Sequence, residues 1–272
     1  MLTIANKSAM TEDYNGGLSL SMVGKKYGVT QQTVSYHFKR MGVPIKTHSE
    51  GKRIYTLDQG AFDRITEESA YWTGVLMADG SVVYDEGHAP LIHLGFKRSD
   101  EGHLLKFKSF LKSSHPIFRR DMRHGKNHPE RLHPFSSVSI RSWRLTEALE
   151  KLGVIPDKTK RTKAVAELVN DRHFWRGVAD GDGCVSSFLA NGGRNRYPQF
   201  TLLGSESLMN QFSRFVFESC EALPKVSFRS GIFSVHLTCS KAASVIRTLY
   251  EKASVFLDRK QVLADRIIKE AA

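Results

Sequence analysis

The chain contains one ten-residue pattern twice, as YWTGVLMADG at residues 71–80 and as FWRGVADGDG at residues 174–183. Each copy has an aromatic pair, a glycine, a small residue four positions further on, and then an acid followed by a glycine. The two acids, Asp79 and Asp182, are 103 residues apart. A pattern that recurs after about a hundred residues predicts two related halves of the chain, with the pattern at the same place in each.

The small residues of the pattern predict how the two copies meet. A glycine inside a helix is destabilising by roughly 0.5–1 kcal/mol relative to alanine, so its presence indicates a compensating contact. Small residues spaced four apart flatten one stripe of a helix, and two such helices can pack backbone to backbone. We expect this helix interface to consist of Gly74, Ala78, Gly177 and Gly181.

That packing would bring Asp79 and Asp182 together at two helix C-termini, where the helix macrodipoles oppose negative charge. A divalent cation would offset the repulsion, because carboxylate and carbonyl oxygens suit magnesium. A metal between two acids also suits phosphodiester hydrolysis. The alternative is a solvated aspartate before a helix-ending glycine, which is common as a single occurrence.

Hydrophobic periodicity predicts the same order of elements after each copy. Strands are expected at residues 81–85, 91–98, 116–122 and 136–141, and again at 184–189, 196–203, 225–229 and 232–238. Helices are expected at about 104–111, 143–152, 205–220 and 240–250. Apolar and polar residues alternate along the strands, so one sheet face packs against helices and the other is polar. The predicted fold class is α+β, with two pseudo-symmetric αββαββα halves of antiparallel sheet at 67–165 and 166–272.

A separate all-α domain is expected at residues 1–47. Residues 18–41 predict a helix-turn-helix, with Gly28 in the turn and Thr30 as the cap of the second helix. The arrangement resembles the small DNA-binding domains of resolvases and transposases. The residues expected to face bases or phosphates are Gln31, Gln32, Ser35, Tyr36, Lys39 and Arg40. A helical hairpin with polar outer residues is the alternative.

Residues 48–66 are expected to connect this domain to the rest of the chain. The stretch from Gly42 to about Thr66 contains Pro44 and the cluster Gly51, Lys52 and Arg53, and it shows little sustained periodicity. The connector either contacts the DNA backbone or only joins two bodies.

Composition agrees with a nucleic-acid partner but does not require one. The 272 residues include 40 Lys and Arg against 28 Asp and Glu, which gives a formal charge of +12. Phosphate binding by such a surface is strengthened by counterion release. Three cysteines are too few for a disulfide framework, and no apolar run approaches the length of a membrane span. We expect an intracellular, nucleic-acid-associated protein of the cytoplasm or nucleoid, with no targeting signal and no membrane partner.

The two motifs resemble the paired signature of LAGLIDADG homing endonucleases, in the single-chain form that contains both halves. The resemblance covers about residues 66–272. It implies that the motif helices form the interface between the halves and that two saddle-shaped sheets lie in the DNA major groove. It also implies a monomer with internal pseudo-two-fold symmetry that binds a double-stranded DNA target.

The resemblance further assigns roles to individual residues. The last acid of each motif, Asp79 and Asp182, would bind metal, with the carbonyls of Ala78 and Gly181 as further ligands. Two or three Mg²⁺ (or Mn²⁺) ions would be shared between the paired acids. A lysine after the final helix of each half would act in catalysis, which points to Lys158 and Lys260, with Lys160 and Arg259 as the nearest alternatives.

The DNA-facing residues of the two sheets are expected among polar positions of the strands. They are His93, Lys97, Arg119, Arg123, Ser139, Arg141, Arg196, Gln199, Arg229 and His236. A histidine-rich stretch with His115, His124, His128 and His133 is expected to be a hairpin tip that touches DNA rather than a zinc site.

One departure from the family pattern concerns the position two residues before each acid. The first motif has Met77 there, where many family members have an acid, and the second has Asp180; this position is not expected to matter.

The leading hypothesis is a site-specific double-stranded DNA endonuclease that serves the homing of a mobile element, with the helix-turn-helix extending its target. One alternative is an RNA maturase or transcriptional regulator that kept the fold without cleavage. A second is a helix-turn-helix regulator with a ligand-binding C-terminal body, which leaves the duplicated acid unexplained.

Overall fold

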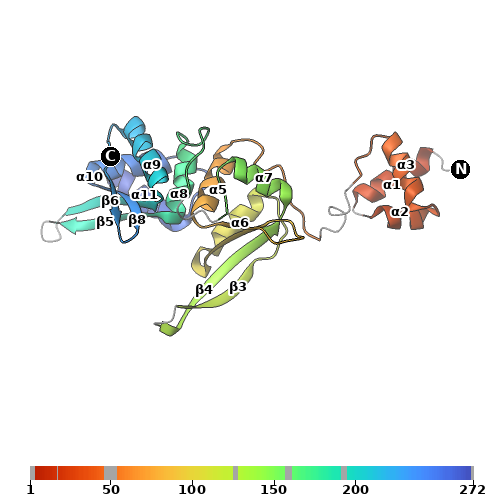
Figure 1. Ribbon diagram of the computed structural model, residues 1–272, viewed down its shortest axis with the longest axis horizontal. Coiled ribbons are helices and arrows are strands. Elements are labelled where there is room, and N and C mark those ends of the chain that lie inside the picture. The colour runs from red at the N-terminus through yellow and green to blue at the C-terminus, as the bar shows by residue number, and fades with distance from the viewer. Residues whose placement is uncertain are drawn as a thin grey trace. The chain divides into compact units, whose positions relative to one another are not determined.

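The computed structural model describes residues 4–16, 18–45, 54–124, 128–156, 161–190 and 195–270. They belong to two compact units, Met1–Tyr55 and Thr56–Ala272 (Figure 1). Each unit is considered by itself below.

The N-terminal unit is a bundle of short helices, α1 (Ile4–Asn15), α2 (Leu20–Tyr27) and α3 (Gln31–Arg40). The Ser19 and Thr30 hydroxyls accept hydrogen bonds from the first turns of α2 and α3. Gly28 ends α2 in the left-handed region, at φ 68°, which a glycine adopts without strain. The core consists of Met10, Tyr14, Val23, Val34 and Phe38.

Helix α1 was not predicted from the sequence. Among its described side chains, those of residues 6–15, Met10 and Tyr14 are the buried hydrophobic ones, one turn apart. The rest of residues 6–15 is polar apart from Ala9, which leaves too few apolar positions for a recognisable helical period, and contact with α2 and α3 stabilises this helix.

The C-terminal unit contains the two related halves. The first comprises α5 (Glu67–Ala78), β1 (Ser81–Val83), β2 (Leu91–Lys97), η1 (Arg98–Asp100), α6 (Glu101–Phe110), β3 (Phe118–His124), β4 (His128–Arg141) and α7 (Trp143–Lys151). The second comprises α8 (Arg172–Asp182), β5 (Gly183–Ala190), β6 (Asn195–Gly204), α9 (Glu206–Cys220), β7 (Val226–Arg229), β8 (Ile232–Thr238), α10 (Cys239–Tyr250) and α11 (Asp258–Glu270). The α+β fold class and the predicted order of elements are confirmed, and the second half has one more helix, α11, that was not predicted.

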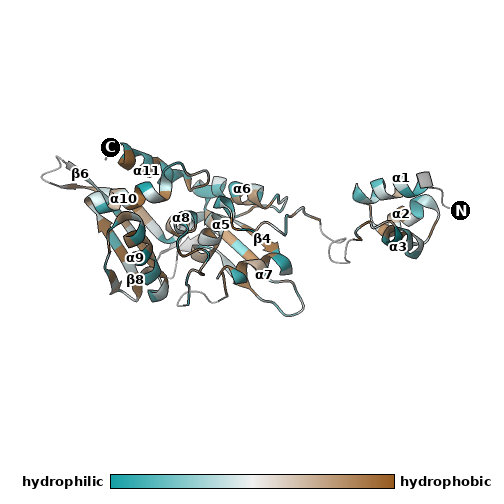
Figure 2. Cartoon of the chain, turned by 90° about the horizontal axis from the view of Figure 1, so that it is seen from above, coloured by the Kyte–Doolittle hydropathy of each residue, from teal (hydrophilic) through white to brown (hydrophobic). Residues whose placement is uncertain are grey.

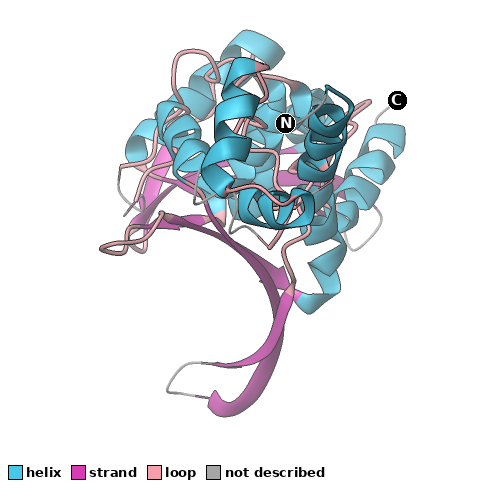
Figure 3. Cartoon of the chain, turned by 90° about the vertical axis from the view of Figure 1, so that its right-hand side faces the viewer, coloured by secondary structure: helices cyan, strands magenta, loops and turns pink. Residues whose placement is uncertain are grey.

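Both sheets are antiparallel and have the same topology. Their strand orders are β1-β2-β4-β3 and β5-β6-β8-β7, so each strand occupies the place of its counterpart. Helices cover one face of the curved sheets, and the other face is left open (Figure 3). Among the described residues, no helix is both long and apolar enough to cross a membrane.

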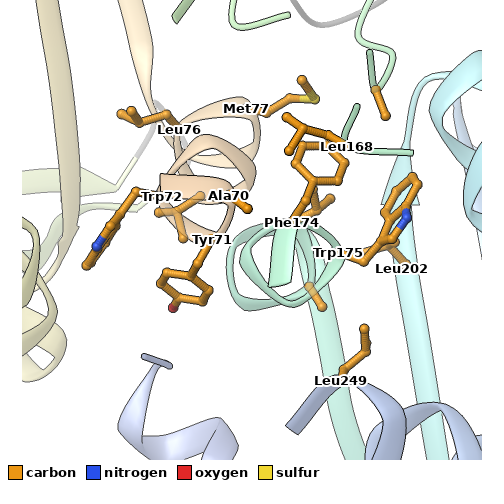
Figure 4. Close-up of a cluster of buried hydrophobic side chains, with 14 of the residues drawn as sticks. Ala70, Tyr71, Trp72, Leu76, Met77, Leu168, Phe174, Trp175, Leu202 and Leu249 are labelled. Atoms are coloured by element: carbon orange, nitrogen blue, oxygen red, sulfur yellow. The ribbon is translucent and has the colours of Figure 1, made fainter. Parts of the chain in front are cut away.

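A single hydrophobic core joins the halves, with α5 and α8 side by side at its centre (Figure 2). Trp72 and Trp175 are fully buried and point outward from the helix pair to opposite sides, each into its own half (Figure 4). Trp72 packs against Phe107, and Trp175 packs against Phe212. The halves therefore form one folding unit and not two separate domains.

Two details differ from the expected elements. Strand β4 begins at His128 rather than near residue 136. Its first part, which contains prolines and histidines, was not expected to be a strand but pairs with β3. Residues 56–66, expected in the connector, contact the body: Phe62 is buried against Phe110, and the Asp58 N–H donates to the Leu111 carbonyl at 2.8 Å.

Candidate functional site

Each motif forms a helix that ends at its acid. Helix α5 begins after Thr66, which forms a reciprocal capping box with Ser69, and Asp79 is its C-cap residue. Helix α8 begins after Asp171, whose carboxylate accepts two backbone N–H groups, and Asp182 is its last residue. Both acids are exposed.

The two motif helices touch through their backbones. A Cβ atom added to Gly74 would lie 2.2 Å from the Phe174 carbonyl oxygen, and one on Gly177 would lie 2.0 Å from that of Tyr71. Phe174 is the counterpart of Tyr71 in the repeat, so the two contacts exchange partners between the helices. This exchange is the signature of a pseudo-two-fold axis between α5 and α8.

The contact continues to the helix ends where the acids lie. A Cβ on Gly181 would be 2.3 Å from the Ala78 Cβ and 3.2 Å from Asp79 Oδ2. The first carboxylate therefore lies beside the last turn of the second motif helix. All four small residues that the sequence places in the interface lie in this contact.

The electrostatics at this end of the pair are unfavourable for acids. The last turns of α5 and α8, which are fully described, contain no basic residue. The negative ends of two macrodipoles therefore meet where Asp79 and Asp182 add two carboxylates.

Lys260 supplies positive charge from outside the motif helices. It is 3% exposed, and its Nζ donates to the carbonyls of Ala179 at 2.6 Å, Asp180 at 2.8 Å and Gly183 at 2.6 Å. Burial lowers the pKa of Lys260, and the nearby carboxylates of Asp180 and Asp79 oppose this shift. Because its three N–H donors all bind carbonyls, this ammonium group caps the C-terminus of α8.

The other lysine predicted for catalysis, Lys158, lies outside the described residues, as does its alternative Lys160. Arg259, the alternative to Lys260, is exposed and donates to Asp100 at 2.9 Å. Of the two candidates that the structure describes, Lys260 lies beside the end of a motif helix, α8, and Arg259 does not.

Asp180, at a position that was not expected to matter, lies in a buried hydrogen-bond network next to the end of α8. It is 3% exposed and accepts hydrogen bonds from the Tyr71 hydroxyl at 2.6 Å, the Tyr250 hydroxyl at 2.7 Å and the Leu257 N–H at 2.8 Å. Burial raises the pKa of Asp180, while the charge of Lys260 and the two hydroxyls act in the opposite direction. A signal was available in the sequence, because Asp180 and Arg176 are charged residues one turn apart within residues 174–181, which are otherwise apolar or small.

Arg176 extends the same buried network. It is fully buried, donates to the Val255 carbonyl at 2.8 Å and to Glu67 at 2.9 Å, and its guanidinium lies 5.3 Å from the Tyr71 ring centroid. Tyr71 also bonds to His103 Nε2 at 2.9 Å. The network thus links both motif helices to α6 of the first half and to the segment before α11.

The first sheet has a polar open face. Residues opposite one another in an antiparallel pair share a face, and Ile92, Leu94 and Phe96 face the helices. The open face therefore includes Ser81, His93, Lys97, Arg120, Ser139 and Arg141. His93 Nδ1 lies 3.0 Å from Ser139 Oγ, and burial lowers the pKa of this histidine.

The second sheet presents a corresponding face. Register and burial place Ser186, Gln199, Thr201, Arg229, Ser234 and His236 on it. Thr201 Oγ1 lies 2.9 Å from His236 Nδ1. Each open face therefore has a histidine–hydroxyl pair between its two central strands, β2 and β4 or β6 and β8.

Two arginines expected on the open faces lie on the opposite ones. Arg119 pairs in register with Ser136, and its guanidinium contacts Glu101 of α6 at 2.6 Å, which with Ser136 lowers the pKa of Glu101 to about 2. Arg196 alternates away from Gln199 and donates to Ser187 Oγ at 2.9 Å. The sequence does not show strand register, and an error of one residue reverses the face.

The remaining predicted contacts fall in other places. In the N-terminal unit, Gln31, Gln32, Tyr36, Lys39 and Arg40 are exposed and Ser35 is half-buried. Residues 52 and 53 lie outside the described residues, and so do the side chains of Arg123, His124 and His128.

No protein-family model and no curated protein matches the sequence. Solved structures share its fold. The I-SmaMI LAGLIDADG homing endonuclease bound to cleaved DNA aligns with a TM-score of 0.50 and 14% identity, covering 76% of this chain and 89% of that chain. A double mutant of I-SmaMI gives a TM-score of 0.51 and 12% identity over 76% and 92% of the two chains. This chain has the LAGLIDADG homing endonuclease fold. The LAGLIDADG meganuclease I-AabMI, bound to uncleaved DNA, aligns with a TM-score of 0.48 and 12% identity, covering 76% of this chain and 92% of that chain.

The acids of this LAGLIDADG fold suit a hard cation. Among the described residues, no group of three or more His, Cys, Asp or Glu side chains is placed to hold a metal ion. A cation held by Asp79 and Asp182 would therefore need further oxygen ligands from the backbone, water or phosphate. Mg²⁺ commonly binds in this way, through one or two carboxylates.

Proposed function

We propose that this chain is a metal-dependent, site-specific endonuclease that hydrolyses one phosphodiester on each strand of a double-stranded DNA target. The observation that supports this most directly is the position of the Asp79 carboxylate beside Gly181, at the end of α8 that contains Asp182. The shared fold with I-SmaMI, which has been crystallised with cleaved DNA, agrees with the proposal.

Metal binding would rest on Asp79 and Asp182, with the carbonyls of Ala78 and Gly181 as further oxygen ligands. Two or three Mg²⁺ or Mn²⁺ ions shared by this pair would polarise the phosphoryl group and lower the pKa of the attacking water. The cations would also offset the repulsion between two carboxylates held at two helix C-termini. The products would have 3′ hydroxyl and 5′ phosphate ends with short 3′ overhangs.

Lys260 has an electrostatic part in this proposal. Its ammonium group is fixed by three carbonyls at the end of α8, so it places a positive charge near Asp182 without a flexible side chain. That charge would stabilise the negative charge that develops on the phosphate. Lys158 is the proposed counterpart in the first half.

The open faces of the two sheets would bind the DNA. His93, Lys97, Ser139, Arg141, Gln199, Arg229 and His236 are positioned on them. Arg120 joins this set in place of Arg119. Side chains on a sheet face in a groove can read base edges, while the arginines and lysine also contact phosphates. Because the two sheets are related by a pseudo-two-fold axis, one chain would contact both half-sites of the DNA target.

The N-terminal unit would extend the target. The exposed residues of α3 include two glutamines, which suit adenine, and Lys39 and Arg40, which suit phosphates. A helix joined to α2 by a tight turn fits the recognition helix of a helix-turn-helix.

The test is incubation of the protein with duplex DNA that spans the uninterrupted insertion site of its gene. Cleavage of both strands with Mg²⁺, and none with EDTA, is the expected result. Binding without cleavage under Mg²⁺ and Mn²⁺ would instead support the alternative of a maturase or regulator that retains the fold.

A further inference from the structure

Asp180 is attached to the segment that precedes and begins α11. Its Oδ2 accepts the Leu257 N–H at 2.8 Å, and its main-chain carbonyl accepts Lys260 Nζ at 2.8 Å. One residue therefore holds both Leu257 and Lys260 against the last turn of α8.

These bonds surround Asp182. Lys260 binds the carbonyl of Asp180, two residues before this acid, and the carbonyl of Gly183, one residue after it, at 2.6 Å. The backbone on both sides of Asp182 is thereby fixed to one ammonium group. The position of Asp182 therefore depends on the position of the first turn of α11, which Asp180 holds through its hydrogen bonds with Leu257 and Lys260.

The Asp180 carboxylate is itself held by hydroxyls from both halves. Tyr71 on α5 donates to Oδ2 at 2.6 Å, and Tyr250 on α10 donates to Oδ1 at 2.7 Å. Because Asp180 is 3% exposed, these donors together with Leu257 replace the water that a carboxylate would otherwise bind.

The first half has no such arrangement among its described residues. The counterpart of Asp180 is Met77, which is 2% exposed. Its Cε lies 3.3 Å from the position of a Cβ on Gly153, in the segment that follows α7. An apolar contact thus stands where the second half has a carboxylate with three hydrogen bonds.

We infer that Asp180 is a positioning residue for the second active centre alone, which it serves by fixing Lys260 and the backbone around Asp182. The inference rests on the proposed function, because it assumes that each acid serves the cleavage of one strand. The inference predicts that cleavage of one DNA strand depends more strongly on Asp180 than cleavage of the other. A residue that only joined the halves would affect both strands by the same factor.

The test uses the full chain with Asp180→Asn and a duplex target labelled separately on each strand. The substitution keeps the shape and removes the charge, and it replaces one of the two acceptor oxygens by an amide N–H₂, which then faces either the Tyr250 hydroxyl or the Tyr71 hydroxyl and the Leu257 N–H. Misplacement of a catalytic group by about 1 Å lowers a rate about 100-fold, so we expect cleavage of one strand to fall about 10- to 100-fold and that of the other to change about twofold at most. The readout is the ratio of the two nicking rates.

Two variants serve as matched controls. Met77→Leu changes the counterpart position without a hydrogen bond and should leave the strand ratio as in the wild type. Ser213→Ala on α9 removes a different buried hydrogen bond, the one to the Pro224 carbonyl at 2.7 Å, and tests whether a general loss of stability alters the ratio.

The outcomes separate this inference from the proposed function. If the wild type cuts neither strand, the proposed function fails. If the wild type cuts both and Asp180→Asn slows both equally, or slows neither, the positioning role is wrong. If Asp180→Asn does not fold, Tyr250→Phe removes one donor and leaves the carboxylate. A smaller bias toward one strand is then expected, and an unchanged ratio would overturn the inference.

Discussion

The alpha carbon of Gly177 lies so close to the carbonyl oxygen of Tyr71 that an added Cβ would be 2.0 Å from that oxygen. No side chain can move aside at this point, because the neighbouring atom belongs to the backbone of α5. The pair of motif helices can therefore approach only with glycine here and at Gly74.

The first prediction concerns Gly177→Ala. Overpacking of a rigid contact typically destabilises a protein by about 1–3 kcal/mol, and we expect the upper end of that range because backbone must shift. The measurement is urea or thermal unfolding of the C-terminal unit. Gly102→Ala is the matched control: it lies on α6 with nothing within 4 Å of the added Cβ, so it should be neutral or stabilising by up to about 1 kcal/mol. Equal effects of the two substitutions would contradict backbone contact between α5 and α8.

A second prediction separates neighbouring arginines on β3. Arg120 lies on the open face above Phe135, whereas Arg119 pairs with Glu101 on the helix-covered face. Arg120→Ala should weaken DNA binding and reduce the slope of log K against log salt by about 0.9, as expected for one lost phosphate contact. Arg119→Ala should leave that slope unchanged. The reverse result would show that the open face is not the DNA-binding face.

The third prediction uses the buried histidine of α6. Burial lowers the pKa of His103 to about 3, so the imidazole is neutral in the folded protein. In the unfolded chain it gains a proton near pH 6.5, and the stability it contributes above that pH is lost as the pH falls toward 3. The loss is about 1.4 kcal/mol per pH unit in that window.

The measurement compares the free energy of unfolding of wild type and His103→Gln at pH 7 and at pH 5. Glutamine keeps a neutral N–H donor for Tyr71 but does not titrate. Its stability should therefore fall less than that of the wild type over this range. A parallel decline in both proteins would mean that His103 binds a proton equally well in the folded state.

The fourth prediction concerns the N-terminal unit. Lys39 is exposed on α3, whereas Lys26 on α2 pairs with Asp13 at 2.7 Å. If α3 contacts DNA, Lys39→Ala should lower affinity for an extended target and reduce the salt slope by about 0.9. Lys26→Ala should leave the slope unchanged. No change for Lys39→Ala would count against the recognition role of this helix.

The sequence predicted the architecture because repetition and periodicity are local signals. The two copies of the motif, the alternation of Ile92, Leu94 and Phe96, and the cap at Thr30 each follow from a few neighbouring residues. Strand register is not local, which is why Arg119 was placed on the wrong face of β3. Among the described side chains of helix α1, residues 6–15, Met10 and Tyr14 are the buried hydrophobic ones, and this spacing was too weak a period to find.

The network around Asp180 was missed for a related reason. Its partners Tyr71, Tyr250 and Leu257 are separated from it by 109, 70 and 77 positions, and only folding brings them together. The motif signature directed attention to Asp182, two residues further on. A charged residue among the apolar and small residues 174–181 was the available indication that Asp180 would need hydrogen-bonding partners.

The most direct test of the central claim is the activity of the variant with both Asp79→Asn and Asp182→Asn on the insertion-site duplex. The substitutions keep the size of both side chains and remove the two charges proposed to bind metal. We predict that the variant binds the duplex at least as tightly as the wild type in the absence of metal and cuts neither strand with Mg²⁺. Cleavage of the duplex by this variant at the wild-type rate would contradict the account.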